Sequence, residues 1–152
     1  MLNEIGVIGR VRPLRTPGLC TGCGTCVQYC KEKAIVIRNG ISVLKDDRCV
    51  QCGVCIQSCH FNLLKAEHRH FLITVGGRRG RHPRIGRELL TVETEEQVIF
   101  AIEKIVNWVY RRAWSGRLLS EQLDELHFEK FRQEIADLMA DSKDIPVKKP
   151  TP

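Results

Sequence analysis

Cysteine is the residue type in this sequence whose number and spacing could do chemistry. The eight cysteines form two C-x2-C-x2-C-x3-C arrays, which are Cys20, Cys23, Cys26 and Cys30, and then Cys49, Cys52, Cys55 and Cys59. Three thiolates on one tight loop can each bind a different iron of one cubane, while the fourth, on a short helix, turns toward the other cluster. The spacing therefore predicts two [4Fe–4S] clusters with crossed ligand sets.

The crossed arrangement assigns every cysteine to one cluster. The first cluster is expected on Cys20, Cys23, Cys26 and Cys59, and the second on Cys49, Cys52, Cys55 and Cys30. Small residues lie between the cysteines, namely Gly22, Gly24, Thr25 and Gly53. They let backbone N–H groups approach the sulfurs, and such hydrogen bonds raise the reduction potential of a cluster.

Zinc and disulfides are the alternatives for clustered cysteines. Zinc ribbons use pairs of C-x2-C and leave no role for the third and fourth cysteine of each array. Disulfide scaffolds are typical of small secreted domains. Because the N-terminus lacks the apolar segment of a secretory signal, we expect a cytoplasmic protein with reduced thiols.

The overall composition is that of a globular protein. The 152 residues are 43% hydrophobic and 28% charged, and no apolar run approaches the roughly 18 residues that a membrane span needs. The net charge is +6, and its basic excess lies upstream of residue 118. This balance excludes a disordered or membrane-spanning chain and favours an acidic partner.

Local patterns predict the elements around and beyond the cysteines. Asn39-Gly40, between two β-rich runs, predicts a type I′ hairpin over 34–44. A short strand is expected over 70–75, and Thr94 with Gln97 forms a capping box that opens a helix expected to stop at Gly116. Ser120 is expected to open a second helix. A third helix carries Phe128, Phe131, Ile135 and Leu138.

An arginine loop (residues 76–87) follows the strand at 70–75. Its candidate site residues are Gly76, Gly77, Arg78, Arg79, Gly80, Arg81 and Pro83. Such a loop can hold an anion through backbone amides and guanidinium forks. A solvated turn and nucleic-acid binding are the other interpretations. No recognition motif or aromatic platform accompanies the latter, so we expect no nucleic-acid partner.

The cysteine arrays and the predicted hairpin resemble the bacterial two-cluster ferredoxins. Lys31 and His60 stand where that family usually has proline after the fourth cysteine, which leaves ligation unaffected. The arginine loop and the capped helix behind it resemble the C-terminal part of sirohaem sulfite and nitrite reductases of the dissimilatory or anaerobic type, over residues 5 to 135. That family's separate cysteine motif for the sirohaem-coupled cluster is not in this sequence.

The resemblance implies an α+β fold, in which a βαββαβ-like ferredoxin module is fused to a small α/β segment with C-terminal helices. The implied parts are a lead-in (1–15), the ferredoxin module (16–68), a reductase-like segment (69–140) and a flexible tail (141–152). We expect electron transfer to a redox partner, with sirohaem present only if another chain supplies it. An active sirohaem reductase subunit and an iron–sulfur nucleic-acid-binding protein are the alternatives. No complete catalytic site is expected in this chain.

Overall fold

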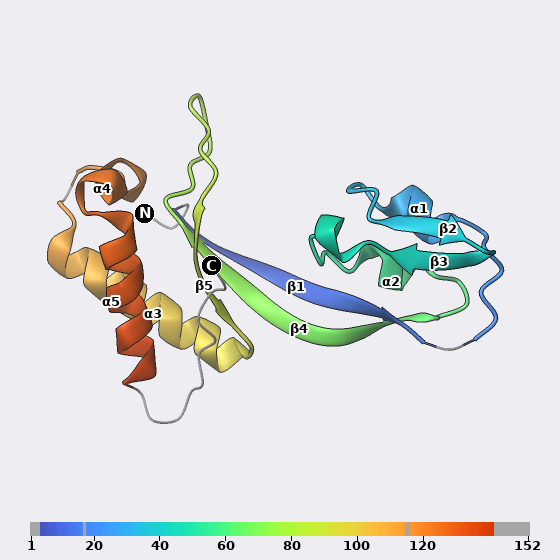
Figure 1. Ribbon diagram of the computed structural model, residues 1–152. Helices are drawn as coiled ribbons and strands as arrows, with labels where there is room; N and C mark the ends of the chain where they lie inside the picture. Colours follow the sequence, from blue (N-terminus) through green and yellow to red (C-terminus); the bar gives the residue numbers. More distant parts are fainter. Residues whose placement is uncertain (1–3, 17, 115, 142–152) are drawn as a thin grey trace. The chain divides into compact units, whose positions relative to one another are not determined.

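Two long strands, β1 (Ile5–Arg15) and β4 (Leu64–Val75), each contribute residues to both structural units of the chain (Figure 1). The computed structural model describes residues 4–16, 18–114 and 116–141. One unit, the cysteine unit, is Gly9–Arg69; the other, the helical unit, combines Met1–Ile8 with His70–Pro152. The four-part division expected from the sequence stays a prediction, and residues 142–152 of its tail lie outside the described residues.

The cysteine unit contains two short helices and a two-stranded sheet. Its elements are α1 (Thr25–Tyr29), β2 (Ile35–Arg38), β3 (Ile41–Leu44), the 3-10 helix η2 (Asp46–Arg48) and α2 (Val54–Ser58). Strands β2 and β3 pair antiparallel, with Arg38 opposite Ile41. Asn39 and Gly40 join them with φ angles of 50° and 74°, which a type I′ turn requires. The hairpin predicted at this site is confirmed.

The helical unit packs three helices against a sheet with strand order β1-β4-β5. Its further elements are β5 (Arg87–Val92), α3 (Glu95–Arg112), α4 (Leu119–Glu125) and α5 (Phe128–Ala140). Strands β4 and β5 are antiparallel, with Phe71 opposite Val92. The strand expected over 70–75 is the last part of the longer strand β4, whose first residues belong to the cysteine unit.

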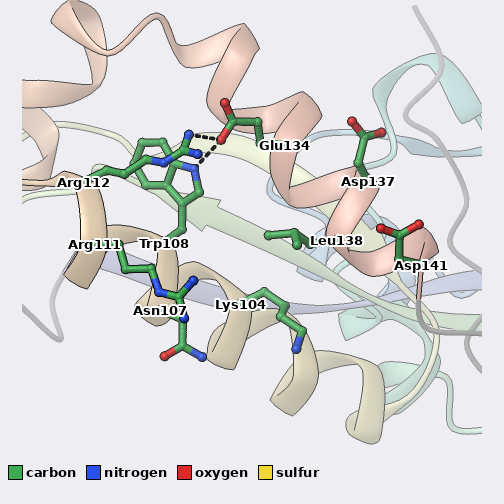
Figure 2. Close-up of a pocket in the computed structure, with 9 residues that line it drawn as sticks. All are labelled: Lys104, Asn107, Trp108, Arg111, Arg112, Glu134, Asp137, Leu138 and Asp141. Carbon is green, nitrogen blue, oxygen red and sulfur yellow. Dashed lines mark hydrogen bonds and ion pairs between the residues drawn. The ribbon is translucent and has the colours of Figure 1, made fainter.

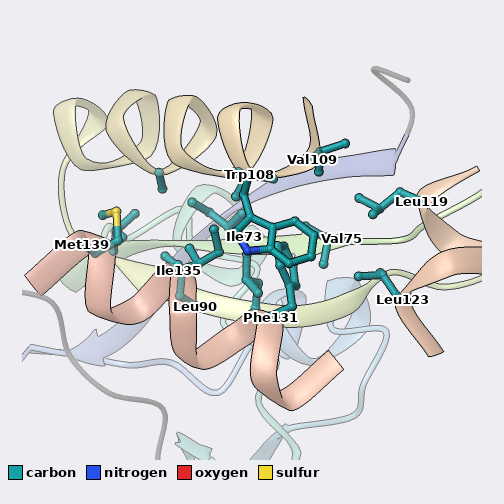
Figure 3. Close-up of a cluster of buried hydrophobic side chains, with 14 residues drawn as sticks. Ile73, Val75, Leu90, Trp108, Val109, Leu119, Leu123, Phe131, Ile135 and Met139 are labelled. Atoms are coloured by element: carbon teal, nitrogen blue, oxygen red, sulfur yellow. The ribbon is translucent and has the colours of Figure 1, made fainter. Parts of the chain in front are cut away.

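One hydrophobic cluster holds the helical unit together (Figure 3). Apolar side chains of β4 and β5 meet the inner faces of the helices, including Ile73, Val75, Leu90, Trp108, Leu123, Phe131, Ile135 and Met139. The Trp108 and Phe131 rings meet edge-on with centroids 4.5 Å apart. Of the apolar residues expected in the third helix, Leu138 is 41% exposed, whereas its neighbour Met139 is fully buried.

Helix α3 begins as the sequence predicts and ends earlier. The Thr94 hydroxyl accepts from Gln97 N–H at 3.2 Å, and Gln97 Oε1 accepts from Thr94 N–H at 3.2 Å, which confirms the capping box. The helix ends at Arg112 with Ala113 extended, so Gly116 is not its stop. The N-cap of α4 is Leu118, which corrects the expectation that Ser120 opens this helix.

The architecture is mixed α/β with helices and antiparallel sheets, as expected, while the βαββαβ description stays a prediction. Over the described ranges 4–16, 18–114 and 116–141, no helix is long and apolar enough to cross a membrane.

Candidate functional site

Two cavities in the cysteine unit collect the eight cysteines in two groups of four. The larger, about 330 Å³, is lined by Cys30, Cys49, Cys52 and Cys55 among its residues. The smaller, about 20 Å³, is lined by Cys20, Cys23, Cys26 and Cys59 among its residues. The structure thus brings together the same cysteines that the sequence assigns to each cluster.

The two short helices explain how the groups are crossed. Cys26 lies in α1 and lines the smaller cavity, whereas Cys30, the C-cap of the same helix, lines the larger one. In α2 the order is reversed, since Cys55 lines the larger cavity and its C-cap, Cys59, the smaller. A five-residue helix is therefore long enough to present one cysteine to each cavity.

Backbone amides donate to the fourth sulfur of each array. Ala34 N–H donates to Cys30 Sγ at 3.3 Å, and Leu63 N–H donates to Cys59 Sγ at 3.4 Å. Each donor follows its cysteine by four residues and immediately precedes a strand, β2 for Ala34 and β4 for Leu63. Such bonds stabilise a thiolate over a thiol, which is the form that binds iron.

The pKa values of the thiols differ with position in the array. A backbone hydrogen bond from Gly22 lowers the pKa of Cys20, and the Thr25 hydroxyl lowers that of Cys23. Burial raises the pKa of Cys26, and burial together with Cys49 raises the pKa of Cys55 to about 11. Bound iron would hold these buried thiols deprotonated, because metal binding displaces the proton.

The donor set fits iron–sulfur clusters. All eight cysteines are free thiols, and each group of four surrounds a space. In the described residues, no three His, Cys, Asp or Glu side chains come close enough to hold a single metal ion. A buried guanidinium nitrogen, Arg15 Nη1, lacks a hydrogen-bond partner among those residues.

The arginine loop is fixed to α4 by ion pairs. Arg78 and Arg84 form a two-hydrogen-bond bridge of 2.9 and 3.0 Å through their backbones. Arg78 Nη1 lies 3.2 Å from Glu121 Oε1, and Arg84 Nη2 lies 3.1 Å from Asp124 Oδ2. Arg87 also pairs with Asp124. Three arginines of this loop therefore bind carboxylates of α4 and hold the loop in place, so they are not free to bind an external anion.

The tip of the loop is exposed. Arg79, Gly80, Arg81, His82 and Pro83 are all exposed, and Figure 1 shows the segment as a narrow loop between β4 and β5. No ion pair joins Arg79 or Arg81 to another residue of the described ranges. The tip is thus the part of the loop whose cations are available to a partner.

Gly76 sets the close contact between the loop and α4. Its φ is +71°, and a Cβ there would lie 2.7 Å from Leu123 Cδ1. Its N–H donates to the Glu4 carbonyl at 2.8 Å, and the Glu4 carboxylate accepts from Ser120 N–H at 2.6 Å. Gly77 lies beside the Gly86 backbone. The first glycines therefore serve packing within the helical unit.

A polar pocket of about 440 Å³ lies between α3 and α5 (Figure 2). No residue pattern in the sequence predicts it. Its cations are Lys104, Arg111 and Arg112, and its acids are Glu134, Asp137 and Asp141. Trp108 Nε1 donates to Glu134 Oε2 at 2.7 Å, and Arg112 pairs with the same carboxylate (Figure 2). Balanced charge of this kind selects neither an anion nor a cation.

Sequence reasoning also missed a polar neighbour of the first array. Ser42, in β3, is buried with its Oγ 3.9 Å from Cys20 Sγ. Ser42 does not belong to a cysteine run. Its approach depends on tertiary folding, which residue spacing does not report.

Comparisons with known proteins agree with the cysteine geometry. Residues 19–63, which include all eight cysteines, match the family described as 4Fe-4S dicluster domain. An uncharacterized protein of Methanocaldococcus jannaschii is 32% identical over 136 residues, covering 90% of this chain and 46% of that protein. The coenzyme F420-dependent sulfite reductase of the same organism is 31% identical over 140 residues, covering 91% of this chain and 22% of that protein.

A solved structure shares the fold. The crystal structure of dissimilatory sulfite reductase I aligns with a TM-score of 0.60 and 19% identity, over 98% of this chain and 41% of that one. The chain spans less than half the length of each curated relative described above. Residues 19–63 therefore carry a 4Fe-4S dicluster domain, within a chain homologous to a sulfite reductase.

Proposed function

We propose that this chain transfers single electrons through two [4Fe–4S] clusters as a ferredoxin-like component related to sirohaem sulfite and nitrite reductases. The proposal rests chiefly on one observation, the collection of eight thiols into two four-cysteine cavities. When bound, the clusters supply one-electron chemistry. The chain's own residues hold the iron, donate hydrogen bonds to the sulfurs and limit access of water.

The cavities support the ligand assignment that we propose. In this assignment Cys20, Cys23, Cys26 and Cys59 hold one cluster, and Cys49, Cys52, Cys55 and Cys30 hold the other. Because α1 and α2 each supply cysteines to both cavities, the two clusters share their supporting helices. This arrangement favours transfer between the clusters over two independent centres.

Metal and sulfide analysis of anaerobically purified protein tests the proposal. We expect about eight iron and eight acid-labile sulfide per chain, with an absorbance band that dithionite bleaches reversibly. Substitution of Cys26 by Ser should lower both contents and the bleaching together. Zinc in place of iron, with no sulfide, would overturn the proposal.

The tip of the arginine loop is the proposed contact with an acidic redox partner. Arg78, Arg84 and Arg87 are engaged with α4, so Arg79 and Arg81 carry the charge that a partner meets. Electrostatic steering of this kind raises association rates and weakens with salt. The double variant Arg79→Glu and Arg81→Glu should slow electron transfer to an acidic acceptor and flatten its salt dependence, whereas Arg111→Glu should not.

A second candidate function is that of a subunit or fragment of an active sirohaem sulfite or nitrite reductase. The identity to coenzyme F420-dependent sulfite reductase favours it. Purification from the native source should then yield a complex with sirohaem absorbance and sulfite or nitrite reduction. A monomer that shows cluster absorbance without a porphyrin band would argue for the independent carrier.

A further inference from the structure

A groove of about 530 Å³ lies between α1 and α2. The residues that line it come from both helices and include His60, which follows Cys59. Three of these residues also line a cysteine cavity. Thr25 lines the smaller cavity, and Tyr29 and Val54 line the larger one. A molecule seated in this groove is therefore one residue away from each cavity.

The groove is open to solvent, since Gln28, Tyr29 and Gln57 are all exposed. Other exposed side chains near the cysteines border one cavity alone. Ile37 and Phe61 are exposed at the smaller cavity and do not line the larger one. The groove is thus an exposed surface that borders both cavities at once.

The lining of the groove is uncharged. In the described part of the chain, none of the residues that line it is Lys, Arg, Asp or Glu, whereas Lys31 and Glu32 line the larger cysteine cavity. The amides of Gln28 and Gln57 can donate and accept hydrogen bonds, and Tyr29 offers an aromatic ring. Tyrosine and a shortage of charged residues are typical of the centre of a protein interface.

We propose that the two clusters exchange electrons with a redox protein through the groove between α1 and α2, and that this partner covers the groove with an uncharged surface. This inference rests on the proposed function, since it needs both clusters. A reduced cluster passes one electron to the partner's one-electron acceptor and returns to its oxidised state. Because electron tunnelling slows steeply with distance, a groove one residue from both cavities suits this transfer. The groove lies in the cysteine unit and is distinct from the tip of the arginine loop, which belongs to the helical unit.

Small outer-sphere oxidants test the route before the partner is known. The chain with both clusters is reduced with dithionite, and stopped-flow absorbance follows its reoxidation by the cation hexaamminecobalt(III) or the anion Co(EDTA)−, each of which takes one electron. The double variant Gln28→Glu and Gln57→Glu should speed reoxidation by the cation at least about twofold at low salt and slow reoxidation by the anion. Both effects should fade as the salt concentration rises.

Asn39→Asp is the matched control. It makes the same change from amide to carboxylate at an exposed position of the turn between β2 and β3, and Asn39 does not line the groove. Its neighbour Gly40 lies against the loop of the first array, where a Cβ at Gly22 would be 2.8 Å from the Gly40 carbonyl oxygen. The control therefore also tests an exit on the hairpin side of the first cluster. An effect of Asn39→Asp as large as that of the double variant would overturn the inference.

The opposite charge tests both the route and the chemistry of the partner. Gln28→Lys with Gln57→Lys should slow reoxidation by the cation and speed reoxidation by the anion, and this pair decides the question if the Glu pair loses iron. Reduction by an anaerobic extract of the native source should be slower than wild type for both pairs, because either charge would be buried against an uncharged surface. A pair that speeds this reduction, or two pairs that leave it unchanged, would contradict the uncharged partner.

Iron and sulfide content separates the two levels of failure. A wild-type chain without about eight iron and eight sulfide contradicts the proposed function itself. Variants that keep both clusters and react with both cobalt complexes at the wild-type rates overturn the inference alone.

Discussion

The amide of Ala34 donates to Cys30 Sγ at 3.3 Å, immediately before β2 begins at Ile35. Leu63 bears the same relationship to Cys59, at 3.4 Å, immediately before β4 begins at Leu64. The fourth cysteine of each array is therefore fixed by the strand that follows it. Cysteine position and sheet formation are coupled at these two points, and each fourth cysteine lines the cavity of the array that does not contain it.

Cys30→Ser should remove the cluster that the second array holds and leave the first. Cys30 lines the cavity of Cys49, Cys52 and Cys55, so its loss breaks that ligand set. We expect about half of the wild-type iron and sulfide. Alkylation followed by mass spectrometry should find those three cysteines reactive and Cys20, Cys23 and Cys26 protected.

Cys59→Ser is the matched variant, and it should give the opposite alkylation pattern. Protection of Cys49, Cys52 and Cys55 in the Cys30→Ser variant would contradict the crossed ligand sets. Each array would then hold its own fourth cysteine.

Asp124→Ala should loosen the arginine loop with little effect on global stability. Asp124 pairs with both Arg84 and Arg87, but its side chain is 56% exposed. Exposed ion pairs contribute about 0–1 kcal/mol, so the free energy of unfolding should change within that range. Trypsin should cleave the loop at Arg79 and Arg81 faster than in wild type. Glu125→Ala, which breaks the pair with Arg117, is the control and should leave cleavage at the loop unchanged.

Local chemistry made parts of the fold predictable. The Asn39-Gly40 turn and the Thr94–Gln97 capping box depend on residues at most a few positions apart, and both are found as predicted. The cysteine groups were predictable because three of the four cysteines that line each cavity are close neighbours in the sequence. The fourth follows from the known geometry of this spacing.

Long-range contacts were not predictable in the same way. The lead-in segment was not expected to be a strand, and β1 forms because β4, some fifty residues later, supplies its hydrogen-bonding neighbour. Helix α3 ends at Arg112 because the following residues turn toward α4, where Trp114 N–H donates to Gln122 Oε1 at 2.8 Å. Ser42 reaches Cys20 of the first array by the same kind of folding, which no spacing rule reports.

Gly76→Ala should destabilise the helical unit by at least about 1 kcal/mol. The φ of +71° is strained for alanine, and the added Cβ would lie 2.7 Å from Leu123 Cδ1. Urea unfolding followed by circular dichroism measures the loss. Gly9→Ala is the matched control, because Gly9 has open space around its Cβ position and no positive φ.

Adding Leu123→Ala to Gly76→Ala should not restore stability, since the backbone strain persists and a core side chain is lost. Equal stability of Gly76→Ala and Gly9→Ala would show that the tight approach of the loop to α4 is not required.

Phe131→Ala should cost about 3–5 kcal/mol of unfolding free energy, because it empties the centre of the helical core. Phe131 is fully buried and contacts Trp108 edge-on, with ring centroids 4.5 Å apart. Loss of that contact should also change the fluorescence of Trp108 in the folded protein.

Glu134→Gln addresses the other side of the indole, where Trp108 Nε1 donates to Glu134 Oε2 at 2.7 Å. The glutamine can still accept this hydrogen bond but loses the ion pair with Arg112, so it should cost much less than Phe131→Ala. If the two variants unfold at the same urea concentration, the helical unit depends on the Glu134 interactions as strongly as on packing. The aromatic pair would then not be the main contact between α3 and α5.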